Sequence, residues 1–215
     1  LWTSKLQGEG IVVAHLVSSS KFAKKSQEAG VDAVVAEGFE AGGHNGREET
    51  TTLSLIPQVC SSVDLPLMAA GGIGCGRSML AAFALGAEGV QVGTRFALTN
   101  ESSANELFKQ RCVSLPEGDT ILSLKKVSPT RLIKNEFYYQ IQELEDKGAS
   151  ADEIRELLGS GRTRKGIFEG NLIDGELEIG QVASSIRSVI SAEQVVKDMI
   201  NEFNDIAIEM CNMKF

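Results

Sequence analysis

The sequence predicts an α/β fold built from a strand–turn–helix unit that recurs between Gly10 and about Cys112. Each unit begins with a short apolar segment, continues through a glycine-rich turn and ends in a helical segment. The apolar segments are continuous rather than alternating, as is typical of parallel strands covered on both faces. Gly30 and Gly86 each end a helical segment just before a carboxylate residue and the next strand, which is the repeated turn of a barrel.

Four strands are expected in this part of the chain, each followed by a helix. The expected strands are Ile11–Val17, Ala33–Ala36, Leu67–Ala70 and Gly89–Val92. The expected helices are Ser20–Ala29, Thr52–Ser62, Gly76–Leu85 and Ser102–Arg111.

Beyond Leu115 the pattern changes and helical segments dominate. Three helices are expected, at Arg131–Lys147, after the capping box of Ser150 and Glu153, and from Ser191 and Gln194 towards Met210. The segment Gly159–Gly180 is rich in glycine and charge, which predicts loops. We therefore expect residues 115–215 to form a helical C-terminal region rather than an obvious second domain.

The turn after the second strand, Ala36–Gly46, combines four glycines with one of only two histidines in the chain. Glycines such as Gly42 and Gly43 let the backbone approach a flat ligand closely. His44 can exchange a proton near neutral pH. A histidine in a glycine-rich loop at a strand end is how a barrel enzyme presents a catalytic group, so an enzyme is the leading hypothesis.

Two further turns predict a phosphate site. Gly71 and Gly72 stand between a strand and a helix, where free backbone N–H groups can hold a phosphate with help from the positive helix end. Gly93 and Thr94 follow the next strand and add two N–H donors and a hydroxyl. Paired turns on successive strand ends are the usual phosphate site of a (β/α)8 barrel, after strands seven and eight.

This placement makes the four strands the fifth to eighth of a barrel, so that strands one to four are absent. A full barrel takes about 250 residues, and an isolated half would expose two unpaired strand edges. We therefore predict that residues 1–114 are the C-terminal half (strands 5–8) of a TIM (β/α)8 barrel and that residues 115–215 pack on it. The missing N-terminal half would come from further residues of the polypeptide or from another chain.

Composition restricts the partners. The formal charge of -8 argues against wrapping nucleic acid, and no apolar run approaches the roughly 20 residues that a membrane span needs. The cysteines lack the spacing of a zinc site or a disulfide framework, so no metal ligand is assigned and a reducing cytoplasm is expected. The sequence leaves open whether copies associate into a homo-oligomer. The cysteines are Cys60, Cys75, Cys112 and Cys211.

These motifs resemble the nitronate monooxygenase family (formerly 2-nitropropane dioxygenases), which includes the FMN-dependent enoyl-acyl-carrier-protein reductases of type II. The resemblance covers nearly the whole chain and is strongest from Gly10 to Glu101. The residues that carry it are the Glu40–His44 loop, the Ala69–Ile73 turn and the Gly93–Phe96 turn.

The resemblance implies an FMN-dependent oxidoreductase that acts on a small-molecule substrate, a nitronate or an enoyl thioester. It implies that His44 faces the substrate beside Gly42 and Gly43. The FMN phosphate would lie on Gly71, Gly72, Gly93 and Thr94, and the flavin near Glu37, Gly38 and Gln91.

Two activities of the family remain as alternatives, and His44 has a role in both. In nitronate oxidation with O2, which we prefer because it needs only flavin, histidine and oxygen, a neutral imidazole removes the C–H proton of a nitroalkane. In enoyl reduction, which also needs NAD(P)H, the histidine orients or polarises the thioester. A third alternative is a non-catalytic barrel fragment. His15 has a packing and a pocket interpretation of equal weight, whereas Arg95 is expected to be a structural ion-pair partner.

Overall fold

The computed structural model describes residues 2–213 of the 215-residue chain. These residues form two compact units. Unit 1 comprises residues 2–39, 46–92 and 197–213, and unit 2 comprises residues 40–45 and 93–196. This grouping differs from a simple division after residue 114, because the His44 loop belongs to unit 2 and most of the last helix to unit 1. The domain boundary inferred from sequence stays a prediction.

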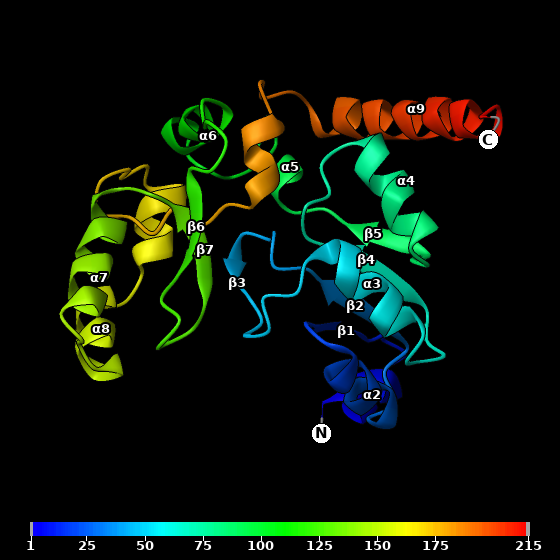
Figure 1. Cartoon of the computed structure of the whole chain (residues 1–215), viewed down its shortest axis with the longest axis horizontal. Helices are drawn as coiled ribbons and strands as arrows, with labels where there is room; N and C mark the ends of the chain where they lie inside the picture. Colours follow the sequence, from blue (N-terminus) through cyan, green and yellow to red (C-terminus); the bar gives the residue numbers. More distant parts are fainter. Residues whose placement is uncertain (1, 214–215) are drawn as a thin grey trace. The chain divides into compact units, whose positions relative to one another are not determined.

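Unit 1 contains a parallel sheet of four strands in the order β1-β2-β4-β5 (Figure 1). Pairs such as Ala14↔Ala33 and Met68↔Gly89 set the register. All four expected strands are confirmed, although the first begins three residues later than predicted. The strands are β1 (Ala14–Val17), β2 (Ala33–Glu37), β4 (Leu67–Ala70) and β5 (Gly89–Gln91).

The helices of unit 1 follow the strands as the sequence predicts. In Figure 1, α3 and α4 lie in front of the sheet, where α3 contacts β2 and β4 and α4 contacts β5. Apolar residues of α3, including Leu55, Ile56 and Val59, are buried in this layer. The helices are α2 (Ser20–Glu28), α3 (Thr52–Cys60) and α4 (Gly76–Ala84), and α1 (Thr3–Gly8) precedes the sheet.

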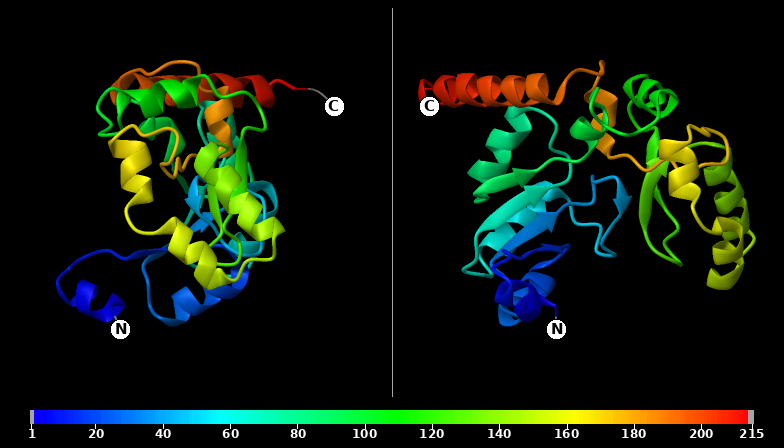
Figure 2. Two further views of the ribbon diagram at one scale, coloured as in Figure 1. Left: turned by 90° about the vertical axis from the view of Figure 1, so that its left-hand side faces the viewer. Right: turned by 180° about the vertical axis from the view of Figure 1, so that it is seen from behind.

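The last helix, α9 (Ala192–Cys211), packs on α4 at a glycine. A Cβ at Gly76 would lie 2.4 Å from the Met199 carbonyl oxygen, so only glycine allows this approach. The Gly76 N–H donates to Glu202 Oε2 at 2.7 Å, and Phe83 meets Phe203 edge-to-face at 5.5 Å. The right-hand view of Figure 2 shows α9, in red, next to one end of α4. The predicted helix from Ser191 towards Met210 is therefore confirmed.

Unit 2 contains an antiparallel sheet in the order β3-β7-β6, which corrects the expectation of a helical region beyond residue 115. Its strands are β3 (Gly43–His44), β6 (Thr120–Ser123) and β7 (Thr130–Ile133). The predicted long helix from Arg131 begins only at Glu136, as α7 (Glu136–Asp146), with Asn135 as its N-cap. All four residues of β7 are buried, since apolar clusters cover both of its faces, with Leu132 in one and Ile133 in the other. Strands also pair on both of its edges. The pairing of β7 with its neighbouring strands therefore outweighs the helical pattern of the local sequence.

The remaining elements of unit 2 are short. The capping box of Ser150 and Glu153 is confirmed at the start of α8 (Ala151–Leu158). The helix expected at Ser102 begins instead after its Asn105 cap, as α6 (Glu106–Val113). The segment expected to be loops contains a π-helical turn. The other elements are α5 (Thr94–Ala97), η1 (Arg164–Phe168) and η2 (Gln181–Ser185).

Arg162 stabilises the loop after α8 through hydrogen bonds to backbone oxygens. Its guanidinium donates to the backbone oxygens of Leu157, Leu158 and Asp174 at 2.7–2.8 Å and lies 4.6 Å from the centre of the Phe137 ring. Arg162 is therefore engaged in structural contacts within unit 2.

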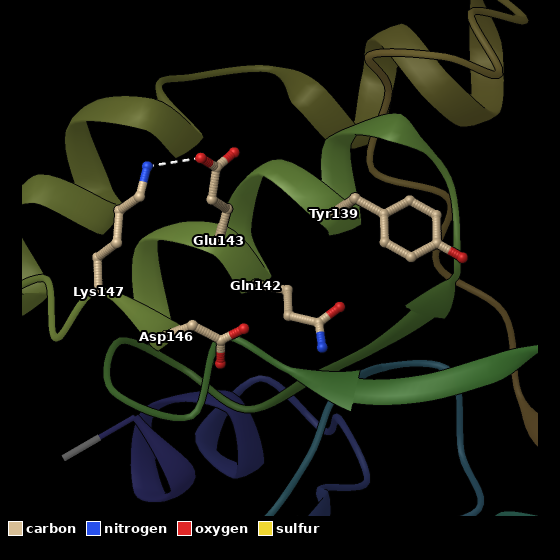
Figure 3. A pocket seen from close by; sticks show the side chains of 5 residues that line it. All are labelled: Tyr139, Gln142, Glu143, Asp146 and Lys147. Carbon is tan, nitrogen blue, oxygen red and sulfur yellow. Dashed lines mark hydrogen bonds and ion pairs between the residues drawn. The ribbon is translucent and has the colours of Figure 1, made fainter.

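The outer face of α7 carries a shallow hollow lined by Tyr139, Gln142, Glu143, Asp146 and Lys147 (Figure 3). Glu143 and Lys147 form an ion pair one helical turn apart across it. Both side chains are mostly exposed, so this face has the character of a solvated surface. Between residues 2 and 213, no helix combines the length and apolarity that a membrane crossing needs.

Candidate functional site

The carboxyl ends of β2, β4 and β5 bring three predicted site segments into one row on unit 1. Glu37 is opposite Ala70, and Ala70 is opposite Gln91 in the register. Gly38 and Gly71 directly follow the first two of these strands. Burial raises the pKa of the Glu37 carboxyl, which is half-buried at the end of β2. The ligand-binding edge of a parallel sheet is this carboxyl end.

Gly71 allows two of these turns to touch. Gly71 and Gly72 have φ values of +88° and +68°, a region that favours glycine. A Cβ on Gly71 would lie 2.6 Å from the Gly38 carbonyl oxygen. The Gly38 N–H donates to the Ala70 oxygen at 2.9 Å, and the Thr52 hydroxyl donates to the Gly71 oxygen at 3.0 Å. Among the described groups, the close backbone approach at Gly71 is thus made to the neighbouring turn.

The expected contribution of a helix end at the Gly71–Gly72 turn stays a prediction. Helix α4 begins at Gly76, four residues beyond Gly72. The N–H groups of Gly74 and Cys75 donate to the Ser78 hydroxyl, and the Gly76 N–H donates to Glu202. In this structure these three N–H groups, at and just before the start of α4, are satisfied by side chains.

Gly93 and Thr94 begin the first short helix of unit 2. Gly93 is the N-cap of α5, and a Cβ built on it has nothing within 4 Å. The Thr94 hydroxyl accepts the N–H of Gly180 at 3.0 Å, so one of its lone pairs is already used. Its own proton remains a donor for another group.

His44 is held by a small strand. β3 pairs with β7 through Gly43↔Arg131 and His44↔Thr130. Asn45 extends this pairing, because its N–H donates to the Pro129 oxygen at 2.8 Å and its side-chain amide donates to the oxygens of Ala41 and Gly43. The backbone of His44 is thus fixed on both sides, while its side chain is exposed.

Gly42 and Gly43 pack against the protein itself. A Cβ on Gly42 would lie 2.5 Å from the backbone nitrogen of Gly180. Gly43 has a φ of +77°, and a Cβ there would lie 2.6 Å from Glu178 Oε2. Both glycines are therefore explained by close packing, and their role towards a substrate stays a prediction.

A cavity of about 130 Å³ lies beside His44 within unit 2. Its polar lining includes Ser128, Thr130, Arg162, Thr163 and Glu176. A small cavity with convergent polar groups beside a histidine is a default candidate for a binding site.

Sequence reasoning missed the carboxylates of this region. Glu176 is 6 % exposed and buried beside Glu178. Burial raises the pKa of the Glu176 carboxyl, and the negative charge of Glu178 raises it further. The hydrogen bond from Thr163 and the charges of His44 and Arg162 oppose this rise. The alternation in Glu176-Leu177-Glu178-Ile179 was a signal for a strand with two carboxylates on one face.

Two other candidates are placed outside this arrangement. His15 is exposed on β1, opposite Val34 in the register. Arg95 is buried and donates to the Ser188 backbone oxygen at 3.2 Å, and its expected role as an ion-pair partner stays a prediction. Across residues 2–213, no group of three or more His, Cys, Asp or Glu side chains is arranged to hold a metal ion.

Comparison with known proteins gives a consistent result. A family model described as nitronate monooxygenase matches residues 2–202. A probable nitronate monooxygenase of Staphylococcus saprophyticus is 32 % identical over 212 residues, which are 94 % of this chain and 59 % of that protein.

Solved structures also resemble the chain. The structure of FabK from Thermotoga maritima matches with a TM-score of 0.90 and 38 % identity, over 96 % of this chain and 65 % of that one. A nitroalkane oxidase from Streptomyces ansochromogenes matches with a TM-score of 0.81 and 29 % identity, over 97 % of this chain and 62 % of that one. The chain therefore spans about three fifths of the length of these relatives.

Proposed function

Because the chain belongs to the nitronate monooxygenase family, we propose that it forms the larger part of an FMN-dependent oxidoreductase that oxidises alkyl nitronates with O2. The observation that carries this proposal is the setting of His44: an exposed imidazole on a fixed backbone, beside a small polar cavity. The Staphylococcus relative and the nitroalkane oxidase structure support the choice of a nitro compound as substrate.

The sheet of unit 1 supports the proposal of a half barrel. Its strand order ends at β1 and β5, and apolar side chains on or next to β1 are exposed, with Val12 at 77 % and Leu16 at 45 %. Exposed apolar edges of this kind need a covering partner. We infer that these strands are strands 5–8 of a (β/α)8 barrel, completed by residues that the matching relatives have and this chain lacks.

We propose that the strand ends hold FMN, with its phosphate on the backbone groups of Gly71, Gly72 and Gly93 and on the Thr94 hydroxyl. The left-handed conformations of Gly71 and Gly72 and the open space where a Cβ of Gly93 would lie support this proposal. Glu37, Gly38 and Gln91 would lie near the flavin. When bound, FMN supplies the electron acceptor for the oxidation.

His44 would act on the substrate as a general base. A neutral imidazole removes the acidic C–H proton of a nitroalkane and becomes an imidazolium, and the substrate becomes a nitronate. Gly42 and Gly43 would let the substrate approach the loop. A substrate already supplied as the nitronate does not need this proton transfer.

The difference between the two substrate forms provides the test. In the polypeptide that contains this chain, loaded with FMN, we expect His44→Ala to lower kcat/KM for a neutral nitroalkane by about 10²–10⁴-fold. The loss with the corresponding nitronate should be smaller, and His15→Ala should change neither rate. Equal activity of wild type and His44→Ala on the neutral nitroalkane would contradict the proposed base.

The second candidate is an NAD(P)H-dependent enoyl-acyl-carrier-protein reductase of type II, which the similarity to FabK favours. Anaerobic flavin reduction separates the two activities. Rapid bleaching by a nitronate supports the oxidase, whereas bleaching by NADPH alone supports the reductase. Absence of flavin absorbance even after FMN addition would support a non-catalytic fragment.

A further inference from the structure

Two glutamates lie on the same strand edge as His44. Strand β7 pairs along its whole length with β6, which occupies one of its two edges. Its other edge carries β3 at residues 130 and 131. It also carries a bridge from Leu132 to Glu178, and the Ile133 N–H donates to the Leu177 oxygen at 2.9 Å. The His44 strand and the glutamate segment therefore follow one another along one edge of β7.

Glu176 and Glu178 are two residues apart in an extended segment, so their side chains leave the same face. Leu177 between them is buried in the apolar core of unit 2. The Glu178 carboxylate faces the loop of His44, because its Oε2 lies 2.6 Å from the position of a Cβ built on Gly43. Glu176 lines the same cavity as His44.

One hydroxyl connects the two carboxylates. Thr163 Oγ1 lies 2.7 Å from Glu178 Oε1 and 3.2 Å from Glu176 Oε2. A hydroxyl has a single proton, so it donates fully to one carboxylate at a time. Two buried carboxylates of like charge that share one donor favour holding a proton or a nearby cation.

The cations that face Glu176 are Arg162 and His44. Arg162 is committed to three backbone oxygens, which leaves its guanidinium with little freedom to move towards the carboxylate. His44 is the group whose charge changes when it takes a proton. The pair of carboxylates thus lies where it can stabilise an imidazolium.

We propose that Glu176, supported by Glu178 and Thr163, is a positioning residue that stabilises the protonated form of His44. This role presupposes the proposed function, in which His44 takes a proton from the substrate carbon and later releases it to solvent. Glu176 would not touch the substrate; it would make the imidazole a stronger base through its negative charge.

The test observes His44 directly and does not depend on turnover. The chain has two histidines, so His15→Gln leaves a single histidine signal in an NMR titration. In that background, we expect Glu176→Gln to move the His44 NMR titration to lower pH, since it removes a nearby negative charge that favours the imidazolium. The matched control is Glu143→Gln on the exposed face of α7, which should leave the midpoint unchanged.

Thr163→Val provides a second variant if Glu176→Gln does not fold. Loss of the hydroxyl removes a hydrogen bond that favours the charged form of Glu176, so the His44 midpoint should again fall, while Thr163→Ser should restore it. The acidic limb of the kcat/KM profile for a nitroalkane should move in the same direction. A His44 midpoint that is the same in wild type and Glu176→Gln would overturn this role, whether or not His44 proves to be the base.

Discussion

Gly71→Ala measures how much the contact between two strand-end turns contributes to unit 1. The φ of +88° at Gly71 strains any L side chain, at a cost of about 1–2 kcal/mol. The new Cβ would also lie 2.6 Å from the Gly38 carbonyl oxygen, a backbone atom that no rotamer change can move. Forcing that turn aside resembles overpacking, which costs about 1–3 kcal/mol. We therefore expect a total loss of about 2–5 kcal/mol.

Gly30→Ala is the matched control within the same unit. Gly30 has a φ of +77°, close to that of Gly71, but a Cβ there has nothing within 4 Å. It should lose only the backbone strain of about 1–2 kcal/mol. The difference between the two variants then isolates the contact with Gly38.

Urea unfolding followed by circular dichroism gives the two free energies of unfolding. FMN titration, followed by flavin fluorescence in the polypeptide that contains this chain, provides a separate measurement. We expect Gly71→Ala to weaken FMN binding and Gly30→Ala to leave it unchanged. If Gly71→Ala is no less stable than Gly30→Ala, then the approach of the two turns does not constrain residue 71 and the reasoning is refuted.

Three other variants test separate parts of the structure. Gly42→Ala should destabilise unit 2 by about 1–3 kcal/mol, because its Cβ would lie 2.5 Å from backbone atoms of Ile179 and Gly180; unchanged hydrogen exchange in residues 40–45 would contradict this packing. Arg162→Ala leaves three backbone oxygens without their donor and should cost about 2–4 kcal/mol in thermal unfolding, whereas an unaltered Tm would mean that water replaces the guanidinium. The pKa of Glu37 is raised by burial, so the folded protein holds its proton to higher pH than the unfolded chain and loses stability as the pH rises through that range. Glu37→Gln should therefore match wild type at pH 4 and be more stable than wild type at pH 7; Tm measurements at both pH values check this, and an equal pH dependence of the two proteins would count against it.

The strands of unit 1 could be predicted because their signal is local. Residues 33–37 and 67–70 are apolar without interruption, and glycines mark the turns on either side. Such continuous segments are required by burial on both faces, whichever neighbours they pair with. The helix starts at Ser150 and Ser191 were equally readable, since an N-cap depends on residues within one turn.

The hairpin of unit 2 could not be predicted in the same way. The segment Thr130–Ile133 comes shortly before helix α7, so the local pattern favours a helical assignment. It also contains Arg131, which is only 2 % exposed although arginine is a charged residue. The strand forms because β3, which comes about 85 residues earlier, pairs with it. Only the three-dimensional structure reveals a pairing of that range.

Part of the candidate site could be predicted from the sequence for the same physical reason. His44 and the glycine turns lie next to strands with strong local signals, so their position at strand ends followed from the sequence. Glu176 and Glu178 lie in a segment rich in glycine and charge, where carboxylates are usually solvated. Their burial depends on Thr163 and β7, which the sequence does not place beside them.

The short pairing of β3 with β7 determines the direction of the His44 side chain as well as its location. Successive residues of a strand point to opposite faces, so a slip of one residue would turn the imidazole away from the cavity and present Gly43 or Asn45 instead. Two residue pairs and the bonds of Asn45 hold this register. A single-residue insertion or deletion between Asn45 and Thr51, or in the turn before Thr130, therefore has an effect out of proportion to its size: the histidine would remain in the chain and the fold could persist, but the base would face the wrong way.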